Sequence, residues 1–273
     1  MTKTNKRIEK WYDLKSKTTI LTGATGRLGR YYADLLAEQG SNLVLIDLDQ
    51  NSCDELADQI RIKYDNRVKG YGIDISKKDE VKKAFALIIK EFKTIDILIN
   101  NAAAQQLTVF DGKLHEFEEF PLEVWQANLN VNLTGAFLCC QEAGKQMVKQ
   151  NRGVILNIGS VYGIVGCDQR IYGDSGINSS IAYATTKSGI VNFTKYLASY
   201  WQGKNIRVNS LSPGGVENKS QTEEFLKNYY YRTMLKRMAN MDDLGSALLY
   251  LVSDASDWVT GTDMVVDGGW TAW

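Results

Sequence analysis

The sequence predicts a single α/β domain in which helices cover both faces of a doubly wound parallel sheet, and two observations predict it. Apolar strand patterns alternate with helical patterns along the chain, as they do in βαβ units with right-handed crossovers. Most strand patterns are followed by a polar or turn-forming residue, and the carboxyl ends of parallel strands meet at one edge of the sheet. The residues in these positions are Asp47, Asp74, Asn101, Ser160 and Pro213. Residues distant in sequence would therefore converge on one crevice, which predicts an enzyme.

Hydrophobic periodicity places the expected elements. The strand patterns cover 18–21, 42–46, 68–73, 95–99, 154–158, 206–211 and 264–266. The helical patterns cover 30–39, 52–63, 77–92, 121–150, 180–201, 223–238 and 242–253. The run 95–99 is apolar except for Asp96, which suits a strand buried on both faces. The pattern at 121–150 predicts one long helical stretch.

Composition limits the class of protein. With 44% hydrophobic residues in a chain of 273, one sizeable core is possible, and we expect a polar N-terminal extension at 1–13 and one domain at 14–273. The 32 basic and 32 acidic residues balance, which argues against a nucleic-acid groove or a membrane-binding patch. Residues 1–17 lack the apolar segment of a secretory signal, and no run of about 18 apolar residues predicts a membrane span. The four cysteines form no metal-ligand or redox pattern, so we expect no metal site and a cytoplasmic location.

A glycine-rich segment, Thr22 to Gly29, lies between the first strand pattern and the first helical pattern. In this context it indicates dinucleotide binding, because glycines let the backbone approach a diphosphate that rests on the free N–H groups of the helix N-terminus. The residues expected to contact the dinucleotide here are Gly23, Thr25, Gly26, Arg27, Leu28 and Gly29. The next strand pattern ends at Asp47, near the separation of roughly 20 residues at which a carboxylate accepts a ribose hydroxyl.

Tyr183 and Lys187 lie four residues apart in a helical pattern, so their side chains share one face. A lysine ammonium beside a phenol lowers its pKa from about 10, which suits a group that exchanges a proton with a carbonyl or an alcohol. The spacing alone is weak evidence, because a chain with 14 tyrosines is expected to hold such a pair by chance. A surface tyrosine packed on a lysine stem is the alternative interpretation. The position favours catalysis, since the pair follows a strand that ends at Ser160.

With these motifs in order, the chain resembles the short-chain dehydrogenase/reductase family in its compact branch, from about residue 14 to residue 269. The motifs that carry the resemblance are Thr22 to Gly29, Asn100 to Ala102, Asn132 in Val131-Asn132-Leu133-Thr134-Gly135, Ser160, Tyr183 with Lys187, Pro213-Gly214 and Asp267-Gly268-Gly269. The resemblance implies a Rossmann-type fold and an oxidoreductase that transfers a hydride between a nicotinamide cofactor and a carbonyl or secondary alcohol.

The resemblance also implies a role for each candidate catalytic residue. Tyr183 would be the acid/base, and Lys187 would hold the nicotinamide ribose and tune Tyr183. Ser160 would hydrogen-bond and orient the reacting carbonyl. Asn132 would hold a water that links Lys187 to bulk solvent, with a structural amide that kinks the helix as the alternative.

Further cofactor contacts follow from the same resemblance. Asp74 and Ile75 would flank the adenine, while Asn101 and Ala102 would lie at the adenosine ribose. The nicotinamide end would contact Pro213, Gly214, Val216 and Asn218, with Val216 at the carboxamide.

Asp47 predicts NAD in preference to NADP. A 2′-phosphate carries roughly −1.5 to −2 charges, and a carboxylate in the same crevice would repel it. Arg27 is the competing residue, because it stands where compact members usually have a glycine, and basic groups in that loop often bind the phosphate in NADP-dependent relatives.

The largest departure from the family pattern is the segment between Ser160 and Tyr183, which is about twice its usual length. Both ends of the extra segment, around 166–179, are fixed at the reacting centre. We therefore expect substrate-pocket segments near 163–181 and 215–238, with a solvated hairpin as the alternative for the first. Basic residues of the second segment, together with Arg170, could bind an anion, or could simply form a solvated helix face.

The substrate is a small molecule with a carbonyl or alcohol group, which the sequence does not identify further. The extra segment and residues 212–232 resemble members associated with flagellin-glycosylation and nonulosonic-acid pathways, which would imply a sugar phosphate or nucleotide sugar. Two other functions stay open: a sugar-nucleotide epimerase or dehydratase that retains NAD, and a non-catalytic dinucleotide-sensing protein. An intact set of catalytic residues argues against the last.

Two helical patterns, 121–150 and 180–201, are apolar on more than one face. Helices of this kind need a partner beyond their own sheet. In the family such helices pair across a two-fold axis, so we expect a homotetramer with two-fold axes.

Overall fold

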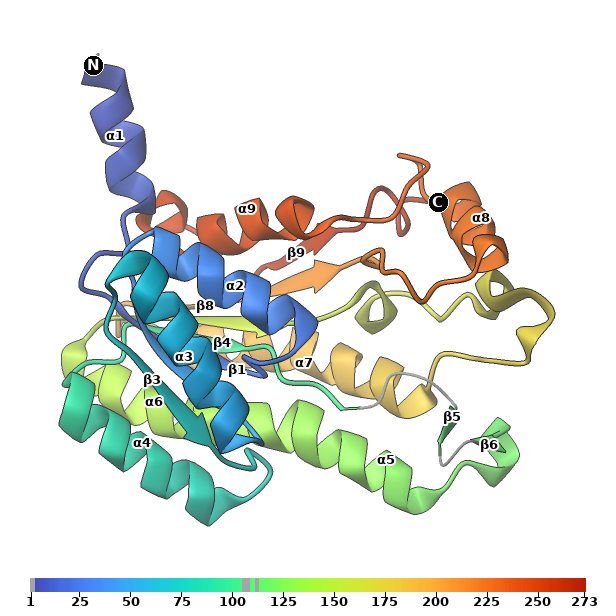
Figure 1. Cartoon of the computed structure of the whole chain (residues 1–273), viewed down its shortest axis with the longest axis horizontal. Helices are drawn as coiled ribbons and strands as arrows, with labels where there is room; N and C mark the ends of the chain where they lie inside the picture. Colours follow the sequence, from blue (N-terminus) through green and yellow to red (C-terminus); the bar gives the residue numbers. More distant parts are fainter. Residues whose placement is uncertain (1–2, 105–108, 111–112) are drawn as a thin grey trace.

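The computed structural model describes residues 3–104, 109–110 and 113–273, and its core is one seven-stranded parallel sheet (Figure 1). The strands are β1 (Thr18–Thr22), β2 (Asn42–Asp47), β3 (Val68–Gly72), β4 (Ile97–Asn100), β7 (Gly153–Ile158), β8 (Ile206–Pro213) and β9 (Asp263–Val266). Their order across the sheet is β3-β2-β1-β4-β7-β8-β9. The predicted fold class, a Rossmann-type doubly wound sheet, is confirmed.

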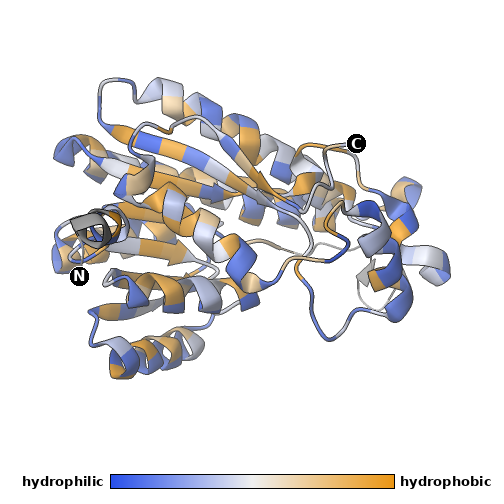
Figure 2. Ribbon diagram, turned by 90° about the horizontal axis from the view of Figure 1, so that it is seen from above, coloured by the Kyte–Doolittle hydropathy of each residue, from blue (hydrophilic) through white to orange (hydrophobic). Residues whose placement is uncertain are grey.

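Helices cover both faces of this sheet. The long helices are α2 (Arg27–Glu38), α3 (Gln50–Tyr64), α4 (Lys78–Phe92), α6 (Ala136–Gln150), α7 (Ile181–Tyr200) and α9 (Met241–Val252). One buried cluster joins α2, α3 and α9 to the sheet, and a second joins α4, α6 and α7 to its other face. Figure 2 shows apolar residues gathered along the strands between these layers. β1 and β4 are buried along their whole length, as expected for central strands that helices cover on both faces.

Strand order creates the crevice that the site uses. The chain starts in the middle of the sheet at β1, builds outward through β2 to β3, and then returns to β4 on the other side of β1. In open parallel sheets, ligands bind beyond the carboxyl ends of the strands where the order reverses. The glycine-rich loop after β1 lies at this point.

The predicted long helix at 121–150 is wrong in one respect, because the structure divides it into three parts. These are α5 (Leu122–Leu129), a π-helical turn η2 (Asn130–Gly135) and α6. A π turn holds one residue more than an α turn, and such turns occur frequently at functional sites. The predicted helix at 223–238 is also shorter, since α8 (Glu223–Arg232) ends where the chain turns toward α9.

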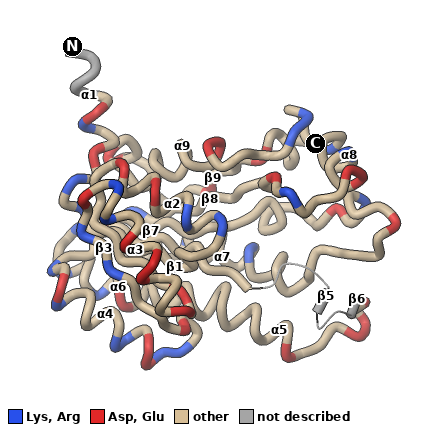
Figure 3. Tube along the Cα trace, viewed as in Figure 1, with Lys and Arg blue, Asp and Glu red and all other residues tan. Residues whose placement is uncertain are grey.

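Short elements complete the described chain. They are α1 (Lys3–Tyr12), β5 (Val109–Phe110), β6 (Lys113–Leu114) and the 3-10 turns η1 (Phe117–Glu119), η3 (Val161–Gly163), η4 (Gln169–Ser175) and η5 (Asp254–Ser256). Within the predicted N-terminal extension, residues 1–2 lie outside the described residues, and the boundary at residue 14 stays a prediction. Basic and acidic residues are interspersed along the trace (Figure 3). None of the helices described is both long and apolar enough to span a bilayer.

Candidate active site

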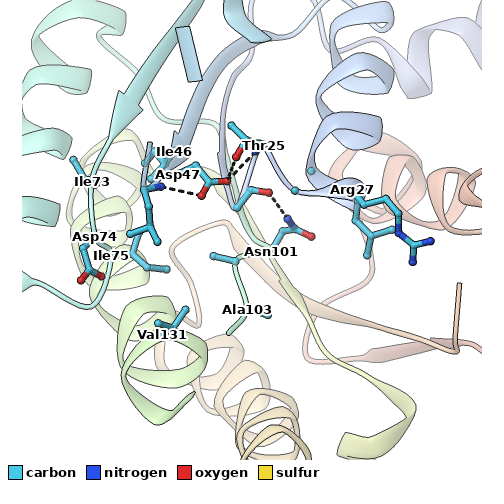
Figure 4. Close-up of a pocket in the computed structure, with 16 residues that line it drawn as sticks. Thr25, Arg27, Ile46, Asp47, Ile73, Asp74, Ile75, Asn101, Ala103 and Val131 are labelled. Atoms are coloured by element: carbon cyan, nitrogen blue, oxygen red, sulfur yellow. Dashed lines mark hydrogen bonds between the residues drawn. The ribbon is translucent and has the colours of Figure 1, made fainter. Parts of the chain in front are cut away.

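A cavity of about 420 Å³ opens beyond the carboxyl ends of β1, β2, β3 and β4, and we call it the glycine-loop cavity. The predicted cofactor residues that line it are Gly23, Thr25, Gly26, Arg27, Leu28, Gly29, Asp47, Asp74, Ile75, Asn101 and Ala102. Figure 4 shows how these side chains surround the space between the glycine-rich loop and the end of β3. The structure therefore brings together every predicted cofactor residue from the first half of the chain.

The glycine-rich loop leads directly into α2 and leaves the N-terminus of that helix open. Gly26 caps the helix without any side-chain hydrogen bond, and the first turn contains no acidic residue. A Cβ atom on Gly29 would lie only 2.0 Å from the carbonyl oxygen of Gly23, so no larger residue fits there. Unpaired N–H groups on a closely packed backbone are the donors that a diphosphate needs, and the loop fits a dinucleotide on this ground.

Asp47 is held in a defined orientation at the rim of the glycine-loop cavity. Its Oδ2 accepts hydrogen bonds from the Thr25 backbone N–H at 2.9 Å and from the Thr25 hydroxyl at 2.7 Å. Its Oδ1 accepts from the N–H of Leu48 at 2.8 Å. The carboxylate keeps acceptor capacity for ribose hydroxyls, because each oxygen can accept more than one hydrogen bond.

Leu48 lines the same cavity and was missed by the sequence interpretation. Its side chain is 73% exposed although it directly follows a buried strand. The sequence signal that could have found it is an apolar residue directly after the expected ribose acceptor, Asp47.

Arg27 points away from Asp47, toward the opposite end of the loop (Figure 4). Its guanidinium donates to the carbonyl oxygens of Glu217 at 2.8 Å and Val216 at 3.1 Å. These two residues begin the segment 215–238, which we call the lid. Arg27 thus ties the glycine-rich loop to the lid, and the structure does not place it beside the position expected for a 2′-phosphate.

A second cavity, of about 720 Å³, adjoins the first at Arg27 and Leu28, and we call it the tyrosine cavity. The predicted residues that line it are Ser160, Tyr183, Pro213, Gly214, Val216 and Asn218. They come from the ends of β7 and β8 and from α7. The two groups of predicted residues therefore meet in one continuous crevice.

Tyr183 and Ser160 both line the tyrosine cavity. Burial raises the pKa of Tyr183 to about 12, and the neighbouring Ser160 side chain opposes this only in part. The predicted lowering of this pKa by a neighbouring ammonium is therefore not what the protein alone achieves. Desolvation of the phenolate outweighs the other influences on the tyrosine.

Lys187 lies under Tyr183 and is 4% exposed. Its Nζ donates to the carbonyl oxygen of Ile158 at 2.6 Å and lies 5.5 Å from the centre of the Tyr183 ring. Burial lowers the pKa of Lys187 to about 8. The helix spacing predicted the shared face correctly, but the lysine's hydrogen bond in this structure is to the backbone and not to the phenol.

Asn132 lies in the π turn and is 3% exposed. Its Oδ1 accepts from the N–H of Ala104 at 2.7 Å, and its Nδ2 donates to the Thr186 hydroxyl at 3.0 Å. The side-chain amide therefore joins the loop after β4 to α7. The helix distortion of the alternative interpretation is present at this asparagine, and its role in holding a water stays a prediction.

The extra segment, residues 166–179, is called the inserted segment below. It forms η4 and packs against α8 of the lid. The tyrosine cavity is lined here by the carboxylate-bearing Asp174 and Glu224. The basic residues considered as anion ligands, Arg170, Lys219, Lys227, Arg232, Lys236 and Arg237, do not line it.

Several aromatic and apolar residues of the tyrosine cavity were not predicted individually. They are Tyr162, Phe225, Tyr229 and Met238. The Tyr229 hydroxyl accepts a short hydrogen bond from the backbone N–H of Gly215. Their positions depend on how the lid folds over the sheet, which no local sequence pattern predicts.

Comparisons with known proteins agree with this geometry. A family model described as enoyl-(acyl carrier protein) reductase matches residues 23–271. The D-threitol dehydrogenase of Mycolicibacterium smegmatis is 31% identical to the chain, with 95% of each sequence covered. The fold and site define an oxidoreductase that uses a nicotinamide dinucleotide and acts on an alcohol or carbonyl group. The chain belongs to the short-chain dehydrogenase/reductase family.

Solved structures show the same fold with either cofactor. A short-chain dehydrogenase from Leptospira borgpetersenii with bound NAD+ has a TM-score of 0.81 and 35% identity, and the match covers 95% of this chain and 94% of that one. A gluconate 5-dehydrogenase from Burkholderia cenocepacia in complex with NADP and tartrate has a TM-score of 0.87 and 27% identity, with 97% and 99% covered.

Proposed function

We propose that the protein interconverts a secondary alcohol and its carbonyl with NAD(H), using Tyr183 as the acid/base, on an uncharged polyhydroxylated substrate. One observation carries the proposal. Tyr183 and Ser160 line a cavity that adjoins the glycine-loop cavity at Arg27 and Leu28. A dinucleotide seated along that loop would extend toward the tyrosine.

The catalytic roles in this proposal are those that the family resemblance implies. The cofactor supplies or accepts the hydride, and the protein aligns the substrate and moves a proton. Tyr183 exchanges that proton with the substrate oxygen, while Ser160 hydrogen-bonds the same oxygen. Lys187 holds the nicotinamide ribose and assists Tyr183. The Asn132 amide donates to Thr186 and accepts from Ala104, and it keeps one N–H and one oxygen lone pair with which it can hold a water that links Lys187 to solvent.

At the nicotinamide end, Pro213, Gly214, Val216 and Asn218 contact the cofactor in this proposal. At the adenosine end, Asp74, Ile75, Asn101 and Ala102 surround the base and its ribose. Asn101 already donates its side-chain N–H groups to the carbonyl oxygens of Thr22 and Gly23, so it also holds the glycine-rich loop in place.

We assign NAD in preference to NADP on the positions of two side chains. Asp47 is fixed by three hydrogen-bond donors at the rim of the cavity. Arg27, the residue that could favour a 2′-phosphate, is engaged with lid carbonyls instead. Bound NAD+ in the Leptospira relative supports this choice, and NADP in the Burkholderia structure is the opposing example.

The charge of the tyrosine cavity supports an uncharged substrate. Asp174 and Glu224 line it, and neither forms an ion pair within the part of the chain that the structure describes. Arg27 is the basic residue in the lining, and its guanidinium is directed to backbone oxygens. Carboxylates accept hydrogen bonds from hydroxyl groups and repel anions, which favours polyols over sugar phosphates and nucleotide sugars. The threitol dehydrogenase relative points to the same substrate class.

The test is a screen for reduction of NAD, read as the absorbance of the reduced nicotinamide. It compares polyols such as threitol with gluconate, sugar phosphates and nucleotide sugars. Turnover of polyols with release of NADH is the expected outcome. Conversion of a nucleotide sugar without net reduction of free NAD would instead support an epimerase or dehydratase, and nucleotide binding without any turnover would support a sensor.

We also propose a cytoplasmic homotetramer. Three cysteines, Cys53, Cys139 and Cys140, are buried free thiols, as suits a reducing compartment. Aromatic residues on α6 and α7 are exposed, with Phe137 at 46% and Tyr200 at 66%. Such residues favour an interface between copies of the chain. Light scattering at micromolar concentration is expected to give the mass of four chains, and a monomer would contradict this.

A further inference from the structure

The inserted segment and α8 of the lid pack together closely although they are far apart in sequence (Figure 1). The Asn228 side chain donates to the carbonyl oxygen of Ile171, and the rings of Tyr172 and Phe225 lie 5.4 Å apart. Gly173 has a φ of +56°, and a Cβ atom there would lie 2.1 Å from Oε1 of Glu224. The two segments therefore meet without a gap.

An ion pair joins the same two segments. Asp168, at the start of η4, has a side chain that is only 9% exposed. Nε of Arg232, the last residue of α8, lies 3.0 Å from Oδ2 of Asp168, although its N–H is not aligned for a hydrogen bond. Arg170 also pairs with Asp168, at 2.7 Å, but it belongs to the inserted segment and is 84% exposed. Arg232 is thus the arginine that reaches Asp168 from the lid.

Arg232 also contacts the C-terminal residues. Its guanidinium carbon lies 5.2 Å from the centre of the Trp270 ring, and that ring stacks on Tyr229 at 4.5 Å. The backbone oxygen of Arg232 accepts a hydrogen bond from Nε1 of Trp273 at 2.9 Å. One residue therefore connects the inserted segment, the lid and the end of the chain.

We propose that Arg232 is a positioning residue that fixes the inserted segment as the outer wall of the tyrosine cavity, with Asp168 as its partner. Ile171 and Tyr172 of the inserted segment and Tyr229 of the lid line that cavity, whereas Arg232 and Asp168 do not. The pair acts through these wall residues. Holding the wall in place before the substrate arrives removes an ordering cost from binding.

The consequence differs between the two halves of the crevice. Without the pair, the inserted segment keeps the Asn228 hydrogen bond and the ring contact with Phe225 but loses its ionic contact with the lid, so the wall becomes more mobile and the substrate binds less tightly. The glycine-loop cavity contains no residue of the inserted segment, so cofactor binding is unaffected. The identity of the substrate pocket rests on the proposed function, while the contacts of Arg232 do not.

The test compares Arg232→Met with Arg170→Met, since both arginines pair with Asp168 but only the first reaches from the lid. Hydrogen exchange of the amides at 168–176 is measured in the protein without ligand, and KM is measured for threitol and for NAD. In Arg232→Met, exchange is expected to accelerate about tenfold or more, because local opening becomes easier. KM for the polyol rises about five- to tenfold, and KM for NAD stays within about twofold. Arg170→Met stays near the unmutated values in all three.

Asp168→Asn provides the second variant, because it weakens the same pair from the other side. It is expected to accelerate exchange at 168–176 as Arg232→Met does. Unchanged exchange in both variants, or equal effects in Arg170→Met, would overturn the inference. If the unmutated protein oxidises or reduces no alcohol or carbonyl compound, the proposed function fails, and hydrogen exchange alone decides whether Arg232 holds the wall.

Discussion

The glycine-loop cavity and the tyrosine cavity adjoin at Arg27 and Leu28, yet they are built from different kinds of segment. The first is lined mainly by residues that directly follow strands, so the sheet itself sets their positions. The second takes much of its lining from the inserted segment and the lid, which hold each other in place. The residues of a site built on strand ends can be predicted from local sequence. The residues of a site built on packed loops depend on contacts between distant parts of the chain.

The largest effect on turnover is expected at Tyr183, where the substrate and the cofactor would meet. Tyr183→Phe keeps the ring but removes the proton that is exchanged. Turnover is expected to fall about 10²- to 10⁴-fold, the usual contribution of a general acid/base. The dissociation constant for NAD, measured by fluorescence titration, stays within about twofold.

Tyr196→Phe is the matched control for this change, because Tyr196 lies on the same helix but is 62% exposed and lines neither cavity. It should retain the unmutated rate. Retention of more than a few per cent of turnover in Tyr183→Phe would show that the acid/base is a different group.

The pH dependence of stability tests whether Lys187 is as buried as the structure shows. Burial lowers its pKa to about 8 in the folded protein, against an ordinary value of 10.5 for a solvated lysine. Between these values the unfolded chain binds more protons, so stability rises with pH across this window. Relative to Lys187→Met, the unmutated protein is expected to gain on the order of 3 kcal/mol in free energy of unfolding between about pH 8 and 10.5. Urea titrations at several pH values measure this, and a difference that does not vary with pH would mean that the lysine is solvated.

The preference for NAD or NADP tests the glycine-loop cavity, whose residues the sheet positions. Asp47→Ala removes the carboxylate that repels a 2′-phosphate, so kcat/KM for NAD is expected to fall about tenfold while that for NADP rises. Arg27→Ala should leave the ratio of the two constants nearly unchanged, because Arg27 is engaged with the lid. A preference for NADP in the unmutated enzyme would reverse the assignment.

The smallest effect is expected at the rim of the other cavity. Glu224→Gln removes one negative charge from a partly solvated position, and screening limits what that charge can do. The ratio of kcat/KM for gluconate to that for threitol is expected to rise about threefold. Glu223→Gln, a change at the neighbouring residue that does not line the cavity, should leave this ratio unchanged. Equal changes in both variants would mean that Glu224 senses only the overall charge of the surface.

The sequence predicted most residues of the glycine-loop cavity, whose positions the sheet determines. The glycine-rich loop, Asp47, Asp74 and Asn101 follow strands whose apolar patterns are plain, and all of them line one cavity. The spacing of Tyr183 and Lys187 gave the wrong direction for a pKa, because the cost of burying charge competes there with the attraction between the two groups. It predicted that Lys187 would lower the pKa of Tyr183, but burial of both side chains dominates in the folded chain.

Details of the site that depend on tertiary contacts could not be predicted from the sequence. The inserted segment was recognised by its length, but neither Arg232 nor Asn228 could be connected to it from sequence, because their partners Asp168 and Ile171 lie more than fifty residues away. Basic residues of the lid were read as candidate anion ligands, whereas Arg232 and Arg237 pair with Asp168 and Asp243. Charge alone does not tell a side chain that faces a ligand from one that faces another loop.

The π turn at Asn130–Gly135 has a consequence for how this chain can change in length. Removing one residue there would restore a regular α-helix. Because a π turn uses one extra residue for about the same rotation, α5 and α6 would stay aligned, but the widened turn that holds Asn132 would be lost. Asn132 would then lose its hydrogen bonds to Ala104 and Thr186. A single-residue deletion in this turn should therefore be far more harmful than a substitution at its exposed residue, Thr134.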